Sequence, residues 1–403
     1  MSDASIHHYW TVTIRTVKRL DAGLAARSRF AFLTLGTIVS LALVACFLAA
    51  RWNVLLTDPE PVFEWYRGLN FVQQCEDPWA PGVDPSLRAR LLPPLFAKAL
   101  GLKGYAVFAI AWVGAVVLVF QTLRWAEVAL KSRLAALAFA VCVSTTSAVV
   151  VPMHWLGIND AWVWLGLLAV VFARASWTVP LACLLCPWID ERFLFALPLA
   201  VWCRTRLDGT GFWKRAIRTG TWLVPFLVLR IILHATTDEG ASAHYLAVAY
   251  AEMSLARNWA PLGWWMGLRA VWVLAVIALI DAAHKRCAVR ELAFVMAAVG
   301  VTTFLAHDYS RSVALLLPWI ALGAVRWRCR HGRTRVHRGR QPGDSRHACR
   351  GAYGRSDSSS APGIVEALLT SKGASGLSPT STWSMGPARP IRVGKRQKPA
   401  AQN

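Results

Sequence analysis

The stretch from Phe30 to Ala50, FAFLTLGTIVSLALVACFLAA, runs for 21 residues without a charged side chain and is bounded by Arg29 and Arg51. An α-helix rises about 1.5 Å per residue, so a run of this length covers roughly the 30 Å hydrocarbon core of a bilayer. The stretch therefore predicts a helix that crosses a membrane.

The composition of the whole chain indicates the same class of protein. It has 403 residues, of which 56% are hydrophobic and 21 are tryptophan, and its mean hydropathy is +0.41. A water-soluble domain of this size could not cover so much apolar side chain with polar surface. Nine further apolar runs lie at about residues 104–123, 134–152, 161–173, 176–189, 193–203, 219–235, 261–280, 291–306 and 313–325. We therefore expect an all-α fold, a polytopic transmembrane helical bundle of about 10 spans, with a range of 8 to 12 because several runs are short for a bilayer.

The basic residues give this bundle an orientation, because Lys and Arg in short loops are retained on the cytoplasmic side. They precede the first span and recur in every second connection: Arg15, Lys18, Arg19, Arg27 and Arg29; Arg124, Lys131 and Arg133; Arg174; Arg204, Arg206, Lys214, Arg215 and Arg218; Lys285, Arg286 and Arg290. This pattern predicts a multi-pass protein of a bacterial-type inner (plasma) membrane, with its N-terminus and C-terminus cytoplasmic.

The sequence divides into three parts. Residues 1–29 form a cytoplasmic N-terminal segment, residues 30–326 a transmembrane domain with its first external loop at 51–103, and residues 327–403 a basic cytoplasmic tail. Residues 326–403 hold 16 Lys and Arg against 3 Asp and Glu, and so contribute +13 of the net charge of +22. Their richness in Arg, Gly, Ser and Pro predicts a disordered segment, or one that is not native coding.

The basic tail also bears on the partners of the chain. Its charge suits adhesion to anionic lipid headgroups, so membrane lipids are expected partners. No DNA-binding or RNA-binding fold signature accompanies the charge, so no specific nucleic acid is expected. The oligomeric state is not indicated by the sequence.

Carboxylates fall mainly in the connections that this topology places outside the cytoplasm. Thirteen do so: Asp58, Glu60, Glu64, Glu76, Asp77, Asp84, Asp160, Asp190, Glu191, Asp238, Glu239, Glu252 and Asp308. Acidic residues steer insertion only weakly, so their segregation is independent of the orientation argument. We interpret it as functional, and expect any chemistry at the outer face.

The first external loop opens with Thr57–Asp58–Pro59–Glu60–Pro61. The prolines keep this stretch out of a helix, so Asp58 and Glu60 are expected on a rigid, extended turn above the first span. Two carboxylates at this spacing can act as a general base, or can hold a divalent cation through their oxygen atoms. Such a cation is the cofactor we consider, with Asp58 and Glu60 as its ligands. A solvated loop that caps the span is the alternative.

Two further groups of charges interrupt apolar sequence. Asp190, Glu191 and Arg192 lie between two half-spans, and Asp308 and Arg311 lie in a short charged segment. Charges below the membrane surface cost several kcal/mol unless they are paired or hydrated, so they usually mark function. An ordinary external hairpin tip is the alternative. The predicted catalytic residues are therefore Asp58, Glu60, Asp190, Glu191, Arg192, Asp308 and Arg311.

Residues 87–102 follow in the same external loop. Apolar side chains alternate there with Arg88, Arg90 and Lys98, which predicts a helix in the interface plane, its basic side toward lipid headgroups. Pro93–Pro94 is expected to interrupt it. No nucleotide-phosphate loop, Rossmann glycine pattern, zinc helix motif or nucleophile elbow occurs in the chain, so the chemistry is left to the outer charges.

This layout resembles the membrane-embedded glycosyltransferases of the GT-C superfamily. Those enzymes share a cytoplasmic N-terminus, a first span, a long external loop that opens with an Asp/Glu motif, interface helices in that loop, and many further spans. Asp58–Pro59–Glu60 holds the position of the motif, and residues 87–102 match the interface helices. As architecture, the resemblance covers about residues 28–325.

The resemblance implies an activity and roles for individual residues. The activity is transfer of a sugar from a polyprenyl-phosphate donor, a lipid-linked partner, to an envelope acceptor at the outer face. Asp58 would be the base that deprotonates the acceptor hydroxyl, and Glu60 would assist it or bind a metal. Arg311 or Arg192 would hold the leaving lipid phosphate.

Two other classes of protein fit the same layout. A polysaccharide polymerase, ligase or flippase also has ten or more spans, and would have an arginine-rich central cavity. A non-catalytic membrane protein or transporter would have charges paired deep within its spans, and Arg230 is the candidate for such a charge.

Overall fold

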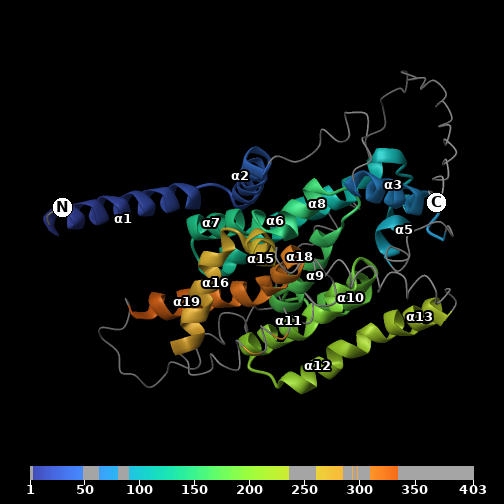
Figure 1. Cartoon of the computed structure of the whole chain (residues 1–403). Helices are drawn as coiled ribbons and strands as arrows, with labels where there is room; N and C mark the ends of the chain where they lie inside the picture. Colours follow the sequence, from blue (N-terminus) through green and yellow to red (C-terminus); the bar gives the residue numbers. More distant parts are fainter. Residues whose placement is uncertain are drawn as a thin grey trace, which may run out of the picture. The chain divides into compact units, whose positions relative to one another are not determined.

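The computed structural model of the chain describes residues 3–48, 63–79, 90–235, 260–284, 293, 297 and 309–334. All regular structure in these residues is helical (Figure 1). The elements are α1 (Asp3–Ala25), α2 (Arg29–Leu48), α3 (Phe63–Glu76), α5 (Leu92–Ala99), η2 (Gly104–Phe108), α6 (Ala109–Leu130), α7 (Arg133–Ser144), α8 (Ser147–His154), α9 (Asp160–Phe172), α10 (Thr178–Leu185), η3 (Cys186–Trp188), α11 (Arg192–Asp208), α12 (Phe212–Gly220), η4 (Thr221–Leu223), α13 (Val224–Ala235), α15 (Ala260–Leu268), α16 (Val271–His284), α18 (Tyr309–Val313), η6 (Ala314–Leu316) and α19 (Leu317–Thr334).

Several sequence predictions concern residues that the structure does not describe. The Asp58–Glu60 motif, Asp308, most of the span expected at 291–306 and the tail beyond residue 334 lie outside the described part of the chain. They remain predictions.

Two described helical stretches are long and apolar enough to cross a membrane, Arg29–Cys46 and Gly104–Leu130. Two bent helix pairs raise that number to four if each pair counts as a single span. The expected helical fold, with helices suited to a membrane, is thus confirmed for the described residues. These residues contain fewer than about 10 candidate spans, so a bundle of that size stays a prediction.

Both bends fall inside runs that the sequence predicts as single spans. The run 134–152 is divided between α7 and α8, which meet at 52°. At this break Ser144, Thr145 and Thr146 each donate a side-chain hydrogen bond to the carbonyl oxygen three residues earlier, which competes with regular helix continuation. The run 261–280 turns by 94° at Arg269, where φ is +44°. Arg269 Nη1 donates to the Thr145 carbonyl oxygen at 3.1 Å, so the two bends contact each other.

Most of the N-terminal segment predicted at residues 1–29 is helical. Residues 3–25 form the helix α1, and its end is held to α7. The Asp21 carboxylate accepts hydrogen bonds from Leu134 N at 2.9 Å and Ser132 Oγ at 3.1 Å, and Arg133 Nη1 donates to the Leu24 carbonyl oxygen at 2.8 Å. Asp21 therefore satisfies one of the amide groups at the start of α7 that a helix leaves unpaired.

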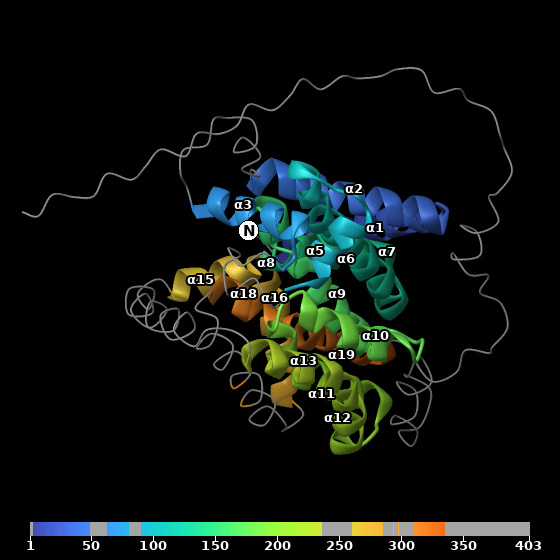
Figure 2. The same cartoon turned by 90° about the vertical axis from the view of Figure 1, so that its right-hand side faces the viewer.

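The helix α9 lies in the interior of the bundle. It packs against α6, α11 and α19 and lies among them in both views (Figures 1 and 2). Small residues let these helices approach closely, as is common in membrane bundles. Gly114 on α6 receives the Trp162 ring, whose Nε1 donates to the Ile110 carbonyl oxygen at 2.9 Å. This contact fixes the position of α9 along the axis of α6.

Helix α5 is shorter than the interface helix expected at 87–102. Pro93 and Pro94 do not interrupt it but stand in its first turn, where the missing N–H has no helical partner to lose. Leu95, Phe96 and Leu100 are exposed, which agrees with an apolar face directed outward.

The outer surfaces of several helices are apolar. Large hydrophobic side chains exposed on α2, α13 and α16 include Phe30, Ile38, Val224, Val228, Ile231, Ile232, Val273 and Val276. Large exposed apolar patches on a protein usually mark contact with another protein or with a membrane. These faces suit contact with lipid.

The packing of α9 gives a direct test. A Cβ atom at Gly166 would lie 2.3 Å from Cys186 Sγ and 3.3 Å from Phe193 Cε2, and both of these side chains are buried. We expect Gly166→Ala to lower the free energy of unfolding by about 1–3 kcal/mol, because buried neighbours must move. Thermal unfolding in detergent measures this effect.

Gly211→Ala is the matched control, since no atom lies within 4 Å of its added Cβ. Equal melting temperatures for the two variants would contradict the packing described for α9.

Candidate functional site

Seven charged side chains from separate segments converge at the start of α9. They are Arg67 on α3, Arg90 just before α5, Asp160 at the first residue of α9, Asp190, Glu191 and Arg192 at the start of α11, and Arg311 on α18. We call this group the ion cluster. Four of its members carry positive charge and three carry negative charge.

Arg311 and Asp160 form its central ion pair. The guanidinium binds the carboxylate in a bidentate manner, with Nε donating to Oδ2 and Nη2 donating to Oδ1. Nη2 also donates to Asp190 Oδ2 at 3.2 Å. A bidentate pair fixes the orientation of both side chains, so α18 and α9 are held in register here.

Local structure positions each partner of this pair. Asp160 occupies the first turn of α9, where the helix dipole favours a negative charge. The segment that carries Arg311 is held by Ser147 Oγ, which donates to the Ser310 carbonyl oxygen at 2.8 Å. Gly267 on α15 also lies against Ser310 and leaves no room for a side chain there.

Asp190 and Arg192 form a compact local unit. The Asp190 Oδ1 atom accepts the backbone N–H of Arg192 at 3.0 Å and its Nε–H at 3.1 Å. An aspartate that binds the amide two residues later makes a tight turn and frees the chain to start a helix. Arg192 Nη1 then lies 3.9 Å from Asp160 Oδ2, which joins this unit to the central pair.

Arg90 connects the segment before α5 to the cluster. Its Nη1 lies 3.3 Å from Asp190 Oδ2, and its Nε lies 3.5 Å from Glu191 Oε2. The sequence predicts that Arg90 faces lipid headgroups together with Arg88 and Lys98. That prediction is wrong for Arg90, because the buried carboxylates attract it inward, whereas Lys98 is exposed.

The central members of the cluster are almost completely buried. The exposed fraction is 4% for Asp160, 2% for Asp190, 8% for Arg192 and 4% for Arg311. Each charge that is removed from water costs several kcal/mol before it is paired. The burial of so many charges in one place therefore has a large desolvation cost, which packing of the helices alone does not require. Groups of this kind usually mark function.

Some polar atoms of the cluster have no hydrogen-bond partner within the described residues. These buried atoms are Arg67 Nε, Arg90 Nε, Arg192 Nη1 and Glu191 Oε2. Three are donors on guanidinium groups, and unsatisfied buried polar groups are rare in native proteins. The arrangement can therefore accept an anion, whose oxygen atoms would take up these donors.

The charges also shift the pKa values of neighbouring groups. Burial, together with the positive charges of Arg311 and Arg90, lowers the pKa of Arg67 to about 9. Burial disfavours the ionised form of Asp190, but Arg192, Arg90 and Arg311 outweigh this effect and hold its pKa below the usual range. Asp190 is thus a fixed counter-charge rather than a proton acceptor.

The structure brings four of the seven predicted catalytic residues together: Asp190, Glu191, Arg192 and Arg311. Asp58, Glu60 and Asp308 lie outside the described residues, so their positions stay predictions. The predicted site also lacks three members of the cluster. In sequence, Asp160 is only one of thirteen carboxylates that are predicted to lie at the outer face. Arg67 and Arg90 lie in the predicted loop 51–103, where no local pattern separates a buried arginine from an exposed one.

Within the described residues, no group of three or more His, Cys, Asp or Glu side chains is arranged to hold a metal ion. The carboxylates of the cluster are all engaged by arginine. The predicted cation ligands Asp58 and Glu60 are not among the residues searched, so a divalent cation remains a prediction.

The chain matches no known protein family, no curated protein and no solved structure at a significant level. Its function is therefore inferred from the cluster itself.

The central ion pair gives a prediction about stability. Arg311→Ala leaves the Asp160 and Asp190 carboxylates buried with less compensation, and we expect it to lower the free energy of unfolding by about 3–5 kcal/mol. The double variant Arg311→Leu with Asp160→Leu should lose much less, because both charges of the pair are removed. Denaturation of the purified variants in detergent measures both effects.

Arg29→Ala serves as the control, because Arg29 is half exposed and pairs with Glu127 at the surface. It should cost at most about 1 kcal/mol. If Arg311→Ala also lowered the free energy of unfolding by only about 1 kcal/mol, this result would contradict a buried ion pair between Arg311 and Asp160.

The lowered pKa of Asp190 gives a prediction about pH. The pKa of an aspartate in the unfolded chain is about 3.9. Above that pH, the stabilisation of the folded state by the ionised Asp190 is therefore complete. It is lost only as pH falls through the lower folded-state pKa. The stability difference between the wild type and Asp190→Asn should stay constant from neutral pH to about pH 4 and shrink below it. A difference that already shrinks near neutral pH would mean that the folded-state pKa is raised.

Proposed function

We propose that the chain is an integral membrane glycosyltransferase, which moves a sugar from a polyprenyl-phosphate donor to an envelope acceptor at the outer face. The single observation that carries the proposal is the ion cluster, a buried group with more arginines than carboxylates and with uncommitted guanidinium donors. Its place among apolar helices suits a substrate that is both a phosphate and a lipid.

The arginines of the cluster fall into two groups by their contacts. Arg311 is engaged by Asp160 and Asp190, so its proposed role is to hold the carboxylates in place. Arg67 and Arg192 each keep a buried N–H without a hydrogen-bond acceptor in the described residues. Guanidinium groups bind phosphate oxygens through parallel hydrogen bonds, so we assign the donor phosphate to Arg67 and Arg192.

Glu191 is the proposed proton acceptor among the described carboxylates. Its side chain is one-third exposed, although its Oε2 atom is buried 3.5 Å from Arg90 Nε. An acceptor hydroxyl can therefore reach the exposed part of this carboxyl group, whereas Asp160 and Asp190 are buried behind arginines. Asp58 is the base that the GT-C resemblance implies, and it remains the alternative.

The proposed reaction balances as a direct displacement. The acceptor O–H gives its proton to Glu191, and the acceptor oxygen forms a bond to the anomeric carbon of the sugar. The bond between that carbon and the phosphate oxygen breaks, and the phosphate leaves with the electron pair. The guanidinium groups of Arg67 and Arg192 stabilise the negative charge that develops on the leaving group.

A second candidate function has one observation in its favour. A polysaccharide polymerase, ligase or flippase is expected to have an arginine-rich centre, and the four arginines of the cluster fit that description. A flippase or transporter would bind the lipid-linked substrate without breaking the bond to phosphate. Measurement of bond cleavage separates these functions.

The test uses the full chain in proteoliposomes with a polyprenyl phosphate that carries a radiolabelled hexose. We expect release of the hexose to an added acceptor, and a loss of about 10²–10⁴-fold in turnover for Glu191→Gln, the range for removal of a general base. Arg67→Gln should raise the KM for the donor and also lower kcat, because Arg67 is proposed both to bind the phosphate and to stabilise the charge that develops on it. Arg29→Gln, a change in the surface pair with Glu127, should leave both constants unchanged.

Two outcomes would contradict the proposal. Wild-type turnover in both Glu191→Gln and Arg67→Gln would remove the cluster from the chemistry. Movement of the labelled donor across the bilayer without cleavage would favour the flippase instead.

A further inference from the structure

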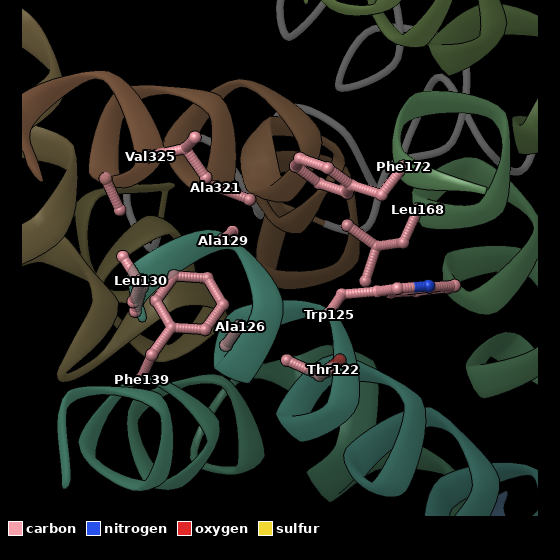
Figure 3. A pocket seen from close by; sticks show the side chains of 11 residues that line it. Thr122, Trp125, Ala126, Ala129, Leu130, Phe139, Leu168, Phe172, Ala321 and Val325 are labelled. Carbon is pink, nitrogen blue, oxygen red and sulfur yellow. The ribbon is translucent and has the colours of Figure 1, made fainter. Parts of the chain in front are cut away.

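The apolar gap between α6, α7, α9 and α19 is too small for a ligand. It is lined by side chains such as Trp125, Phe139 and Phe172 (Figure 3). It admits only about 20 Å³, which is the room that roughly one water molecule needs. A partner larger than water would have to bind elsewhere, and the exposed face of α12 offers such a surface.

The helix α12 has two faces of different character. It packs against α11 and α10 and lies at the margin of the bundle in both views (Figures 1 and 2). The side chains of Phe212 and Ala216, one turn apart, pack against the hydrophobic core, and Thr219 on the same side is buried. The described residues thus cover one face of α12 and leave the opposite face uncovered.

The uncovered face carries large apolar side chains. Trp213 and Ile217 lie one turn apart, and their exposed fractions are 76% and 68%. A helix in contact with water normally turns its polar residues outward and its apolar residues toward the core. Exposure of a tryptophan and an isoleucine side by side is therefore unfavourable unless an apolar partner covers them.

A stripe of positive charge runs beside this apolar stripe. Lys214 and Arg218 each directly follow one of the two apolar residues, so they lie about 100° further round the helix, and both are exposed. Residues four apart on a helix have their Cβ atoms about 5–6 Å from each other. The two cations can therefore bind the same phosphate group.

In the described part of the chain, no carboxylate neutralises Lys214 or Arg218. The Asp208 carboxylate is already bound by Arg204 Nε at 2.9 Å and by Arg215 Nη2 at 2.8 Å. The sequence contains no Asp or Glu from residue 209 to residue 237. The uncovered face of α12 therefore fits a partner that combines an apolar part with a negative charge.

The exposed apolar surface continues from α12 into α13, and this continuity identifies the partner. Val224, Val228 and Ile231 follow at helical spacing and are each at least half exposed. The helix α13 lies within the apolar run 219–235, which the sequence predicts as a membrane span. A bilayer covers both helices at once, and it places a tryptophan at the level of the headgroups, where this residue is enriched.

We infer that the exposed face of α12 binds the surface of a membrane that contains anionic lipids. Trp213 and Ile217 lie between the headgroups and the start of the acyl chains, and Lys214 and Arg218 bind a lipid phosphate. The sequence-based orientation places these cations on the cytoplasmic side, where the leaflet carries anionic lipids. The inference does not rest on the proposed glycosyl transfer.

The test places a photoreactive side chain at the inferred contact. In the full chain, Trp213 is replaced by p-benzoylphenylalanine, and the protein is reconstituted in phosphatidylcholine vesicles with a minor fraction of phosphatidylglycerol. After irradiation, mass spectrometry identifies the captured lipid. We expect adducts with phosphatidylglycerol well above its share of the vesicle lipid.

The same photoreactive side chain at position 38 is the control. Ile38 on α2 is also exposed, but it lies in the charge-free run Phe30–Ala50. It should capture the two lipids in proportion to their abundance, because no cation near it favours an anionic headgroup.

Two charge variants of the protein with the probe at position 213 separate a specific contact from net charge. Lys214→Gln should lower the enrichment of phosphatidylglycerol about fivefold, the effect of one cation near an anionic surface. Arg215→Gln removes the same charge from the same helix, but its guanidinium is bound to Asp208. The enrichment should therefore fall much less in this variant.

Three outcomes would overturn the inference. Adducts of the probe at position 213 with a second copy of the chain, and not with lipid, would favour a protein partner. Capture of phosphatidylglycerol only in proportion to its abundance would contradict an anionic surface. Equal losses in Lys214→Gln and Arg215→Gln would contradict the assigned contact, because net charge alone would then explain the enrichment.

Discussion

The burial of opposite charges at the start of α9 is the constraint on which the arrangement of the described helices depends. Asp160 and Asp190 are almost inaccessible, and each is compensated by arginines from other segments. Removal of one partner leaves a charge in a medium that cannot solvate it. The pairing therefore sets the relative positions of α9, α11 and α18. It also brings Arg90, which lies shortly before α5, to the same point. Apolar packing, which lacks direction, could not specify this convergence alone.

The sequence predicts the class of the fold better than its details. Charge-free runs such as Phe30–Ala50 predict helices because backbone groups in lipid must be satisfied within the segment. The bends near Thr145 and Arg269 are not visible in hydropathy, since they arise from hydroxyl hydrogen bonds and from a positive φ at one residue. Hydropathy does not indicate the helix α1 either, because its residues alternate in polarity without forming an apolar run.

The candidate site could likewise be predicted only in part from the sequence. Asp190, Glu191, Arg192 and Arg311 are predictable because charges within apolar sequence are costly and rarely accidental. Asp160 carries no such signal, as it simply precedes an apolar run. Arg90 is misassigned, because an arginine that alternates with leucines looks the same in sequence whether its partner is a lipid headgroup or a buried carboxylate. Only the three-dimensional proximity of Asp190 and Glu191 separates the two cases.

The central claim is that the ion cluster binds a phosphate group attached to a lipid. Binding of a sugar-free polyprenyl phosphate to the full chain, compared with the uncharged polyprenol of the same length, tests this claim most directly. Saturable binding of the phosphate, with a strong preference over the alcohol that is lost in Arg192→Gln, is the predicted result. Equal binding of phosphate and alcohol, or a preference that survives Arg192→Gln, would contradict the claim.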